Sequence, residues 1–280
     1  MKLYALNTGN FKLDGGSMFG VVPKVLWQKS YPTDENNLCN WAMRSMLVVD
    51  GDRKILMETG IGDKHNEKFL KNYQLNGGEP LETSLSRHGF TVDAITDVVL
   101  SHLHFDHCGG CVRYKKGGPG FELVFKNACH WISRQQWECA LHPNKREKAS
   151  YIQDDFLPIK ELGNLRLIEN DTQINSHIKL RLYNGHTDGQ ILTYVNYHGR
   201  TVVFAADLLP SAAHIPLPYI MAYDNYPLIT LKEKAEFLKD AVANDYILFF
   251  VHDVYNECGS LHSTEKGITI KGTFAAGSII

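Results

Sequence analysis

Short apolar runs recur along the chain, and most of them end at turn residues, which predicts β-strands. Residues 46–57 place two apolar runs on either side of Gly51-Asp52, a pattern typical of a β-hairpin. A second hairpin is predicted over residues 191–205, with its turn at His198-Gly199. Further strands are predicted over residues 96–100, 178–183 and 246–251.

Amphipathic stretches lie between these runs, and their spacing predicts helices over residues 62–73, 80–89, 134–140 and 230–243. Thr230 would cap the last helix, with Glu233 completing a capping box. A further helix is expected after the Gly109-Gly110 turn. Because strands occur in hairpins as well as beside helices, we expect an α/β (α+β) fold with mixed sheets layered with helices.

Composition sets broad limits on the function. The chain has 280 residues, 44% of them apolar and 21% charged, and no linker or repeat divides it, so we expect a single domain over residues 1–280. A net charge of −2 gives no reason to expect nucleic acid or a membrane surface as a partner. No signal peptide or membrane-spanning stretch is visible, so we expect a cytoplasmic protein. The six scattered cysteines do not form a disulfide framework.

Potential metal ligands stand where four separate strand-like runs end. These residues are His102, His186, Asp207 and His252. Loops at strand ends are the places where a rigid sheet can bring distant residues to one point. A carboxylate after so apolar a strand as residues 202–206 is costly unless it is paired or bound to a cation. This placement therefore predicts a functional site.

The segment His102-Leu103-His104-Phe105-Asp106-His107 holds four potential metal ligands in six positions. In an extended backbone His102 and His104 point to the same side, so both can reach one cation. Asp106 and His107 project in different directions and suit a second cation, or another face of the first. Imidazole and carboxylate together are the ligands of a transition-metal site.

With these residues in place, the chain resembles the metallo-β-lactamase-fold hydrolase superfamily. The resemblance rests on His102-x-His104-x-Asp106-His107, Gly185-His186-Thr187, Asp207 and His252 in that order, with Glu58-Thr59-Gly60 before them. It implies an αββα sandwich of two mixed sheets flanked by helices. It also implies one metal on His102, His104 and His186, a second on Asp106, His107 and His252, and Asp207 bridging both. The chain departs from the usual pattern at Glu58 and Asp188, where the family has Asp and Pro.

This resemblance implies hydrolysis by hydroxide held between two divalent cations. Zinc is the expected metal, and Mn, Fe or Co also suit these ligands. Asp106 is expected to pass a proton to the leaving group. The segments 101–110 and 14–20 most resemble the quorum-quenching acyl-homoserine-lactone lactonases and the methyl-parathion-hydrolase-like enzymes. Many lactonases have a substrate-contacting tyrosine where this chain has Pro210. The predicted replacement is His214 first, with Tyr219 and Tyr223 as the alternatives.

Three other functions remain open at this stage. A phosphotriesterase or arylesterase of the same fold is the nearest, and a glyoxalase II-like thioesterase would share all seven ligands. A metal-stabilised binding module without activity is the third. We expect a small-molecule ester or lactone as the substrate and, because relatives are often dimers, a homodimer as one option for the assembly.

Overall fold

The computed structural model describes residues 1–279 as two compact units. Unit 1 comprises Met1–Asn10 and Met43–Asn170, and unit 2 comprises Phe11–Ala42 and the chain from Asp171 onward. The long strands β1 (Lys2–Asp14) and β2 (Leu38–Asp50) run from one unit into the other. The expectation of one domain over residues 1–280 stays a prediction.

Unit 1 is built on a mixed sheet with the strand order β1-β2-β3-β4-β7-β8. β2 and β3 form the predicted hairpin, with Asp50 opposite Arg53, and the strands from β3 to β8 are parallel. The remaining strands are β3 (Arg53–Met57), β4 (Asp97–Val99), β7 (Cys129–Ser133) and β8 (Leu165–Ile168), and a separate hairpin pairs β5 (Val112–Tyr114) with β6 (Phe121–Leu123).

The helices of unit 1 bury a continuous apolar core against this sheet. The helices that do so are α4 (Leu81–Arg87), α5 (Phe105–Cys108), α6 (Arg134–Leu141) and α7 (Gln153–Glu161), whereas α3 (Glu67–Tyr73) has no buried residue. Leu56 and Val98 from the strands pack in one cluster with Trp137 of α6 and Phe156 of α7. Cys108 and Cys111 lie in the same cluster, and burial raises the pKa of the Cys111 thiol to about 12. Both pack as small apolar residues in the core next to the histidine segment.

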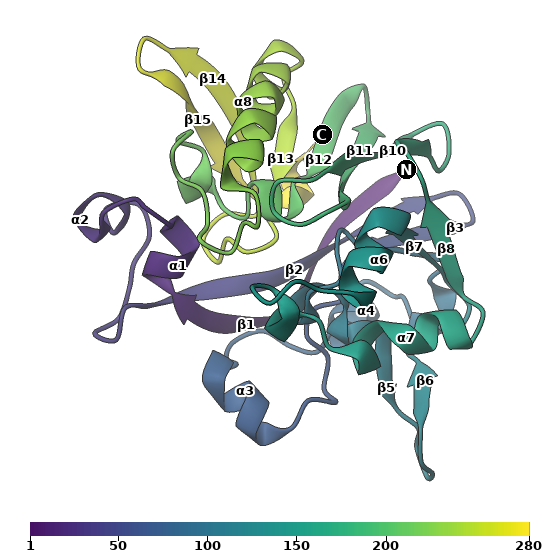
Figure 1. Ribbon diagram of the computed structural model, residues 1–280. Helices are drawn as coiled ribbons and strands as arrows, with labels where there is room; N and C mark the ends of the chain where they lie inside the picture. The colour runs from purple at the N-terminus through teal and green to yellow at the C-terminus, as the bar shows by residue number, and fades with distance from the viewer. Residues whose placement is uncertain (280) are drawn as a thin grey trace. The chain divides into compact units, whose positions relative to one another are not determined.

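Unit 2 is built on a seven-stranded mixed sheet with the order β15-β14-β13-β12-β11-β10-β9. Its strands are β9 (Thr172–Gln173), β10 (Ile178–Tyr183), β11 (Gln190–Tyr197), β12 (Arg200–Phe204), β13 (Ile247–Phe249), β14 (Cys258–Thr264) and β15 (Gly267–Phe274). The long helix α8 (Pro227–Ala243) lies against β14 and β15 (Figure 1). Two short helices, α1 (Gly15–Phe19) and α2 (Lys24–Trp27), complete this unit.

The predicted strands and hairpins are confirmed, but several helix ends were wrong. α3 begins at Glu67 instead of residue 62, because the Asn66 side chain caps it by accepting a hydrogen bond from the Phe69 amide (2.9 Å). α8 begins at Pro227, so Thr230 lies inside the helix rather than at its cap. The helix expected after Gly109-Gly110 is a single 3₁₀ turn that leads into β5.

Among residues 1–279, no helix combines the length and the apolar character that crossing a bilayer requires.

Candidate metal centre

The histidine segment of unit 1 begins at His102, three residues after β4 ends at Val99. The His102 ring centroid lies 4.5 Å from that of His104 and 4.0 Å from that of His107. Asp106 Oδ2 lies 3.4 Å from His107 Nε2. All three rings are buried, and Asp106 is partly exposed. The four predicted ligands of this segment are therefore brought together within unit 1.

Glu58 orients this segment from the end of β3. Its Oε1 accepts a hydrogen bond from the Ser101 amide (2.7 Å), and its Oε2 lies 3.2 Å from His107 Nδ1. Ser101 Oγ in turn contacts His102 Nδ1 at 2.8 Å. Glu58 has a left-handed φ of 66°, a strained conformation for a residue with a side chain. Glu58 is one methylene longer than the aspartate usual in the family. Its carboxylate still contacts both the Ser101 amide and the His107 ring.

A second carboxylate, which the sequence did not single out, lies beside His104. Glu147 Oε2 is 3.7 Å from His104 Nε2 and accepts a hydrogen bond from the Tyr151 hydroxyl (3.1 Å). The Tyr151 ring lies 4.9 Å from that of His104. A sequence pattern can reveal a ligand's partner only when the two residues lie a few positions apart. Glu147 and Tyr151 lie more than 40 residues after His104, so no local pattern pointed to them.

The end of the histidine segment is anchored from below. Thr59 donates hydrogen bonds to the His107 carbonyl from its amide (2.9 Å) and its hydroxyl (3.1 Å). The Lys64 ammonium donates to the Gly109 carbonyl and forms an ion pair with the fully buried Asp155 of α7. Breaking a buried pair by removing one partner leaves an uncompensated charge, so this anchor is rigid.

The three predicted ligands of unit 2 also meet one another. They follow β10, β12 and β13 along the chain, as the apolar runs predicted. Asp207 presents its two oxygens to different rings: Oδ2 lies 3.3 Å from His186 Nε2, and Oδ1 lies 3.2 Å from His252 Nε2. A carboxylate whose oxygens face in two directions is suited to bridge two cations.

The far nitrogen of each ring in unit 2 is held by a partner. His186 Nδ1 is 2.7 Å from Asp224 Oδ1, and His252 Nδ1 is 2.8 Å from the Ala42 carbonyl. The Asp207 amide donates to Gln190 Oε1 (3.0 Å), and the residue before it, Ala206, has a left-handed φ of 44°. Asp224 lies 38 residues after His186, and the sequence analysis missed it.

The donors of each unit have the chemistry of divalent-cation ligands. Histidine ligands in metalloproteins commonly donate the ring N–H that does not face the metal to a carboxylate, a carbonyl or a hydroxyl. His107, His186 and His252 each have a carboxylate or carbonyl beside Nδ1, and His102 has a hydroxyl there. This leaves the Nε2 edge of each ring as the metal-facing edge. Neutral imidazoles and carboxylates suit zinc and other first-row metals.

Two of the residues predicted to contact the substrate differ in outcome. His214 is almost fully buried, its Nδ1 contacts Ser211 Oγ (2.7 Å), and its Nε2 contacts the Met18 carbonyl (2.9 Å). Its ring stacks on Phe19 at 4.6 Å, and burial lowers its pKa to about 3. Both ring nitrogens are thus engaged inside unit 2, and the structure argues against the predicted substrate contact. Tyr223 is partly exposed, and its role stays a prediction.

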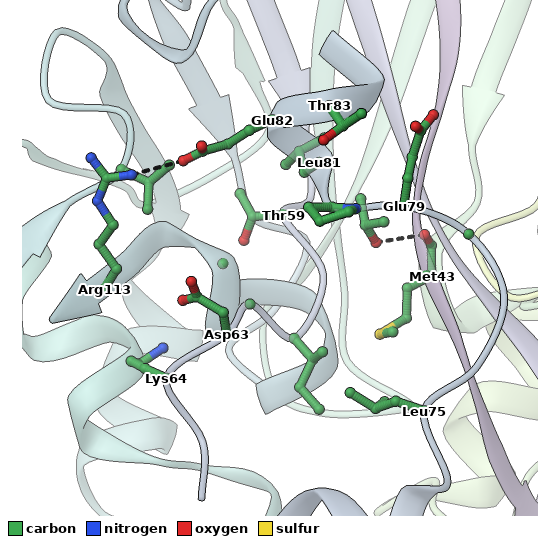
Figure 2. Close-up of a pocket in the computed structure, with 18 of the residues that line it drawn as sticks. Met43, Thr59, Asp63, Lys64, Leu75, Glu79, Leu81, Glu82, Thr83 and Arg113 are labelled. Atoms are coloured by element: carbon green, nitrogen blue, oxygen red, sulfur yellow. Dashed lines mark hydrogen bonds and ion pairs between the residues drawn. The ribbon is translucent and has the colours of Figure 1, made fainter. Parts of the chain in front are cut away.

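A cavity of about 830 Å³ lies wholly within unit 1, and none of the predicted donors lines it (Figure 2). Its wall combines apolar side chains such as Met43 and Leu75 with the ion pair between Arg113 and Glu82 (2.8 Å). Thr59 is shared between this wall and the anchor of His107. The cavity is therefore separate from the donors, although one wall residue contacts their backbone.

Residues 44–252, well over half of the chain, match the family described as the metallo-beta-lactamase superfamily. The chain belongs to this superfamily. The predicted fold class is thereby confirmed, and the chain is a metallo-β-lactamase-fold hydrolase by family. The matched region begins in the middle of β2 and ends at His252, so it includes all seven predicted ligands.

Individual relatives cover nearly the whole chain. An N-acyl homoserine lactonase from Bacillus cereus is 24% identical over 272 residues, which is 92% of this chain and 95% of that protein. The crystal structure of "a probable metal-dependent hydrolase from Staphylococcus aureus" is similar with a TM-score of 0.89 and 28% identity, over 100% of this chain and 98% of that one. The structure of AidC, a dizinc quorum-quenching lactonase with its product, has a TM-score of 0.78 at 23% identity, over 97% and 94% of the two chains.

Proposed function

We propose that this superfamily member opens the ring of a lactone, with N-acyl homoserine lactones as the substrate class, and that it does so with two divalent cations. One observation carries the proposal: both units contain rings with an oxygen beside Nδ1 and Nε2 left to face a metal, and these rings are His102, His107, His186 and His252. Rings oriented in this way need little rearrangement when a metal binds, and this arrangement is typical of metal sites in proteins. The lactonase relatives support the substrate class.

In this proposal the two groups of donors act together. His102, His104, Asp106 and His107 supply the ligands of unit 1, and His186, Asp207 and His252 supply those of unit 2. When bound, the two cations supply hydroxide at neutral pH and polarise the carbonyl of the substrate. Zinc is the expected metal.

The chain's own residues have defined tasks in the reaction. Glu58 and Asp224 keep two rings in the orientation that exposes Nε2. Asp106 is partly exposed and lies against His107, so its carboxylate can hold a proton and deliver it to the alkoxide that leaves when the ring opens. The step needs no serine or cysteine nucleophile. Cys108 and Cys111 are buried, and burial raises the pKa of both thiols, so neither can serve as one.

A substrate panel with metal analysis tests this function. The panel contains a long-chain N-acyl homoserine lactone, p-nitrophenyl acetate and paraoxon, all assayed on one metal-loaded preparation. We expect kcat/KM to be highest on the lactone, to fall to background after chelation, and to return with added Zn²⁺. Preference for paraoxon or the aryl ester would favour the phosphotriesterase or arylesterase alternative. Metal content without turnover on any of the three would favour a binding module.

A further inference from the structure

We propose that Glu233 and Lys234, adjacent residues of α8, are positioning residues that set the geometry of the metal donors in unit 2. This inference rests on the metal centre of the proposed function and is independent of the substrate. The sequence had assigned Glu233 to a helix cap. The structure gives the two side chains contacts with two different segments of unit 2, both of which touch the donors.

Glu233 holds the turn that carries His186. Its two carboxylate oxygens accept hydrogen bonds from the Asn184 amide (2.7 Å) and the Gly185 amide (2.9 Å), the two residues before this ligand. A charged acceptor makes the stronger kind of hydrogen bond with an amide. The helix also lies too close to Gly185 for any side chain there, since a Cβ would stand 2.4 Å from the Thr230 backbone.

The residues just before α8 complete the hold on the same turn. The Tyr226 amide donates to the Gly185 carbonyl (2.9 Å), and the Asn225 amide donates to the His186 carbonyl (3.0 Å). Asp224 contacts the His186 ring. One stretch of chain, residues 224–233, therefore contacts the turn, the backbone and the ring of this ligand.

Lys234 holds the segment that connects Asp207 to this stretch. It is 1% exposed, and its ammonium donates to the carbonyls of Pro216 (2.9 Å) and Tyr219 (2.8 Å). Burying an ammonium group is costly, and burial lowers the pKa of Lys234 to about 7, although the nearby charge of Asp224 acts to raise it. The two hydrogen bonds of Lys234 fix the middle of a segment that begins at Asp207. In the same segment, the Pro210 carbonyl accepts a hydrogen bond from the His252 amide (3.0 Å).

The two neighbours thus restrain the donors of unit 2 from separate directions. Glu233 fixes the His186 turn, and Lys234 fixes the connection that starts at Asp207 and contacts His252. Because α8 is a rigid helix anchored on β14 and β15, both restraints share one support. Loosening either one is expected to weaken metal binding without removing a ligand.

The test compares Glu233→Gln with Glu236→Gln, and Lys234→Met with Lys232→Met, where the second member of each pair is an exposed control on the same helix. Zn²⁺ affinity is measured by competition with a chromophoric chelator. We expect about 10-fold weaker binding in Glu233→Gln and in Lys234→Met, within the range typical for partners of metal ligands, and no change in the controls. Circular dichroism confirms that each variant is folded.

Hydrogen exchange in the metal-free proteins gives a readout that needs no metal and no activity. Glu233→Gln should speed exchange at the Asn184 and Gly185 amides, and Lys234→Met should speed it across residues 211–223, while the β14–β15 hairpin stays protected. Zn²⁺ affinities equal to those of the controls, in folded variants, would overturn the inference and leave the proposed function standing. A wild-type chain that binds no Zn²⁺ would instead overturn the proposed function.

Discussion

The donors of unit 1 and those of unit 2 are assembled in opposite ways. In unit 1 four donors lie in one run of six residues, His102 to His107, so a single turn of chain brings them together. In unit 2 three donors come from three strand ends, up to 66 residues apart between His186 and His252 by the printed numbering. In local assembly the distant partners support one segment of chain, whereas distant assembly depends on what holds each of three strand ends.

Removing a donor should expose this difference most strongly. Asp207 contacts both histidines of its unit, while Asp106 contacts one, so Asp207→Asn is expected to lower kcat/KM about 1,000-fold and Asp106→Asn about 30-fold. Steady-state kinetics on the lactone, with metal content measured on each sample, checks the order. Equal losses would mean that the two carboxylates have equivalent roles.

Removing an orienting carboxylate should have a smaller effect. Glu58→Gln in unit 1 and Asp224→Asn in unit 2 are each expected to weaken Zn²⁺ binding about 10- to 100-fold, because an amide no longer accepts the imidazole N–H as a charged oxygen does. The loss should be larger for Asp224→Asn, since the His186 turn has no neighbouring donor in sequence. Chelator competition measures both, and a larger loss for Glu58→Gln would contradict the comparison.

Two buried histidines outside the donor sets extend the comparison to stability. His130 in β7 has no hydrogen-bond partner for either ring nitrogen among the described residues, and burial lowers its pKa to about 4. His214 in unit 2 has a partner at both nitrogens. At pH 7 we expect His130→Phe to stabilise by about 1 kcal/mol and His214→Phe to destabilise by about 2 kcal/mol. Denaturant unfolding of metal-free protein measures both values.

The same histidine makes a prediction for pH. The folded state holds His130 neutral, so the unfolded state binds more protons between the unfolded pKa near 6.5 and the folded pKa of about 4. Stability from this residue is therefore complete above pH 6.5 and is lost as the pH falls toward 4, by on the order of 3 kcal/mol. The wild type should lose more stability than His130→Phe over this range. Parallel pH profiles would show that the residue does not titrate as described.

The smallest effect is expected at a strained backbone position. Ala206, before Asp207, holds a left-handed φ of 44°, and Glu58, whose side chain accepts a hydrogen bond from the Ser101 amide, holds a φ of 66°. Ala206→Gly relieves strain but adds freedom to the unfolded chain, so stability should change by less than about 1 kcal/mol. Zn²⁺ affinity should be unchanged. A clear loss of affinity would show that the methyl group itself positions Asp207.

Much of the fold could be predicted because its signals are local. The hairpins around Gly51-Asp52 and His198-Gly199 follow from turn chemistry and alternating apolar residues, and they were predicted with correct pairing. Helix ends were predicted less accurately where a side chain expected to cap the helix forms hydrogen bonds with another segment instead. Glu233 matched a capping pattern, but its carboxylate binds the amides of residues 184 and 185 instead. Sequence spacing alone could not distinguish these uses.

The candidate ligands could also be predicted, since each one follows an apolar strand or lies in a dense cluster. Their supporting residues could not. Asp224 and Glu147 are ordinary acidic residues in sequence and become significant only when the fold places them beside His186 and His104. His214 was predicted to contact substrate because it is a histidine in the loop after Asp207, and sequence alone could not show that its ring is buried between Met18 and Ser211.

The central claim is that the donors of the two units together hold a pair of cations, and metal content tests it most directly. The wild-type chain is stripped with a chelator, reloaded with Zn²⁺, freed of excess metal and analysed for zinc per chain. The account predicts about two ions per chain in the wild type, and fewer in Asp207→Asn. A wild-type chain that is folded and retains less than about one ion would contradict it.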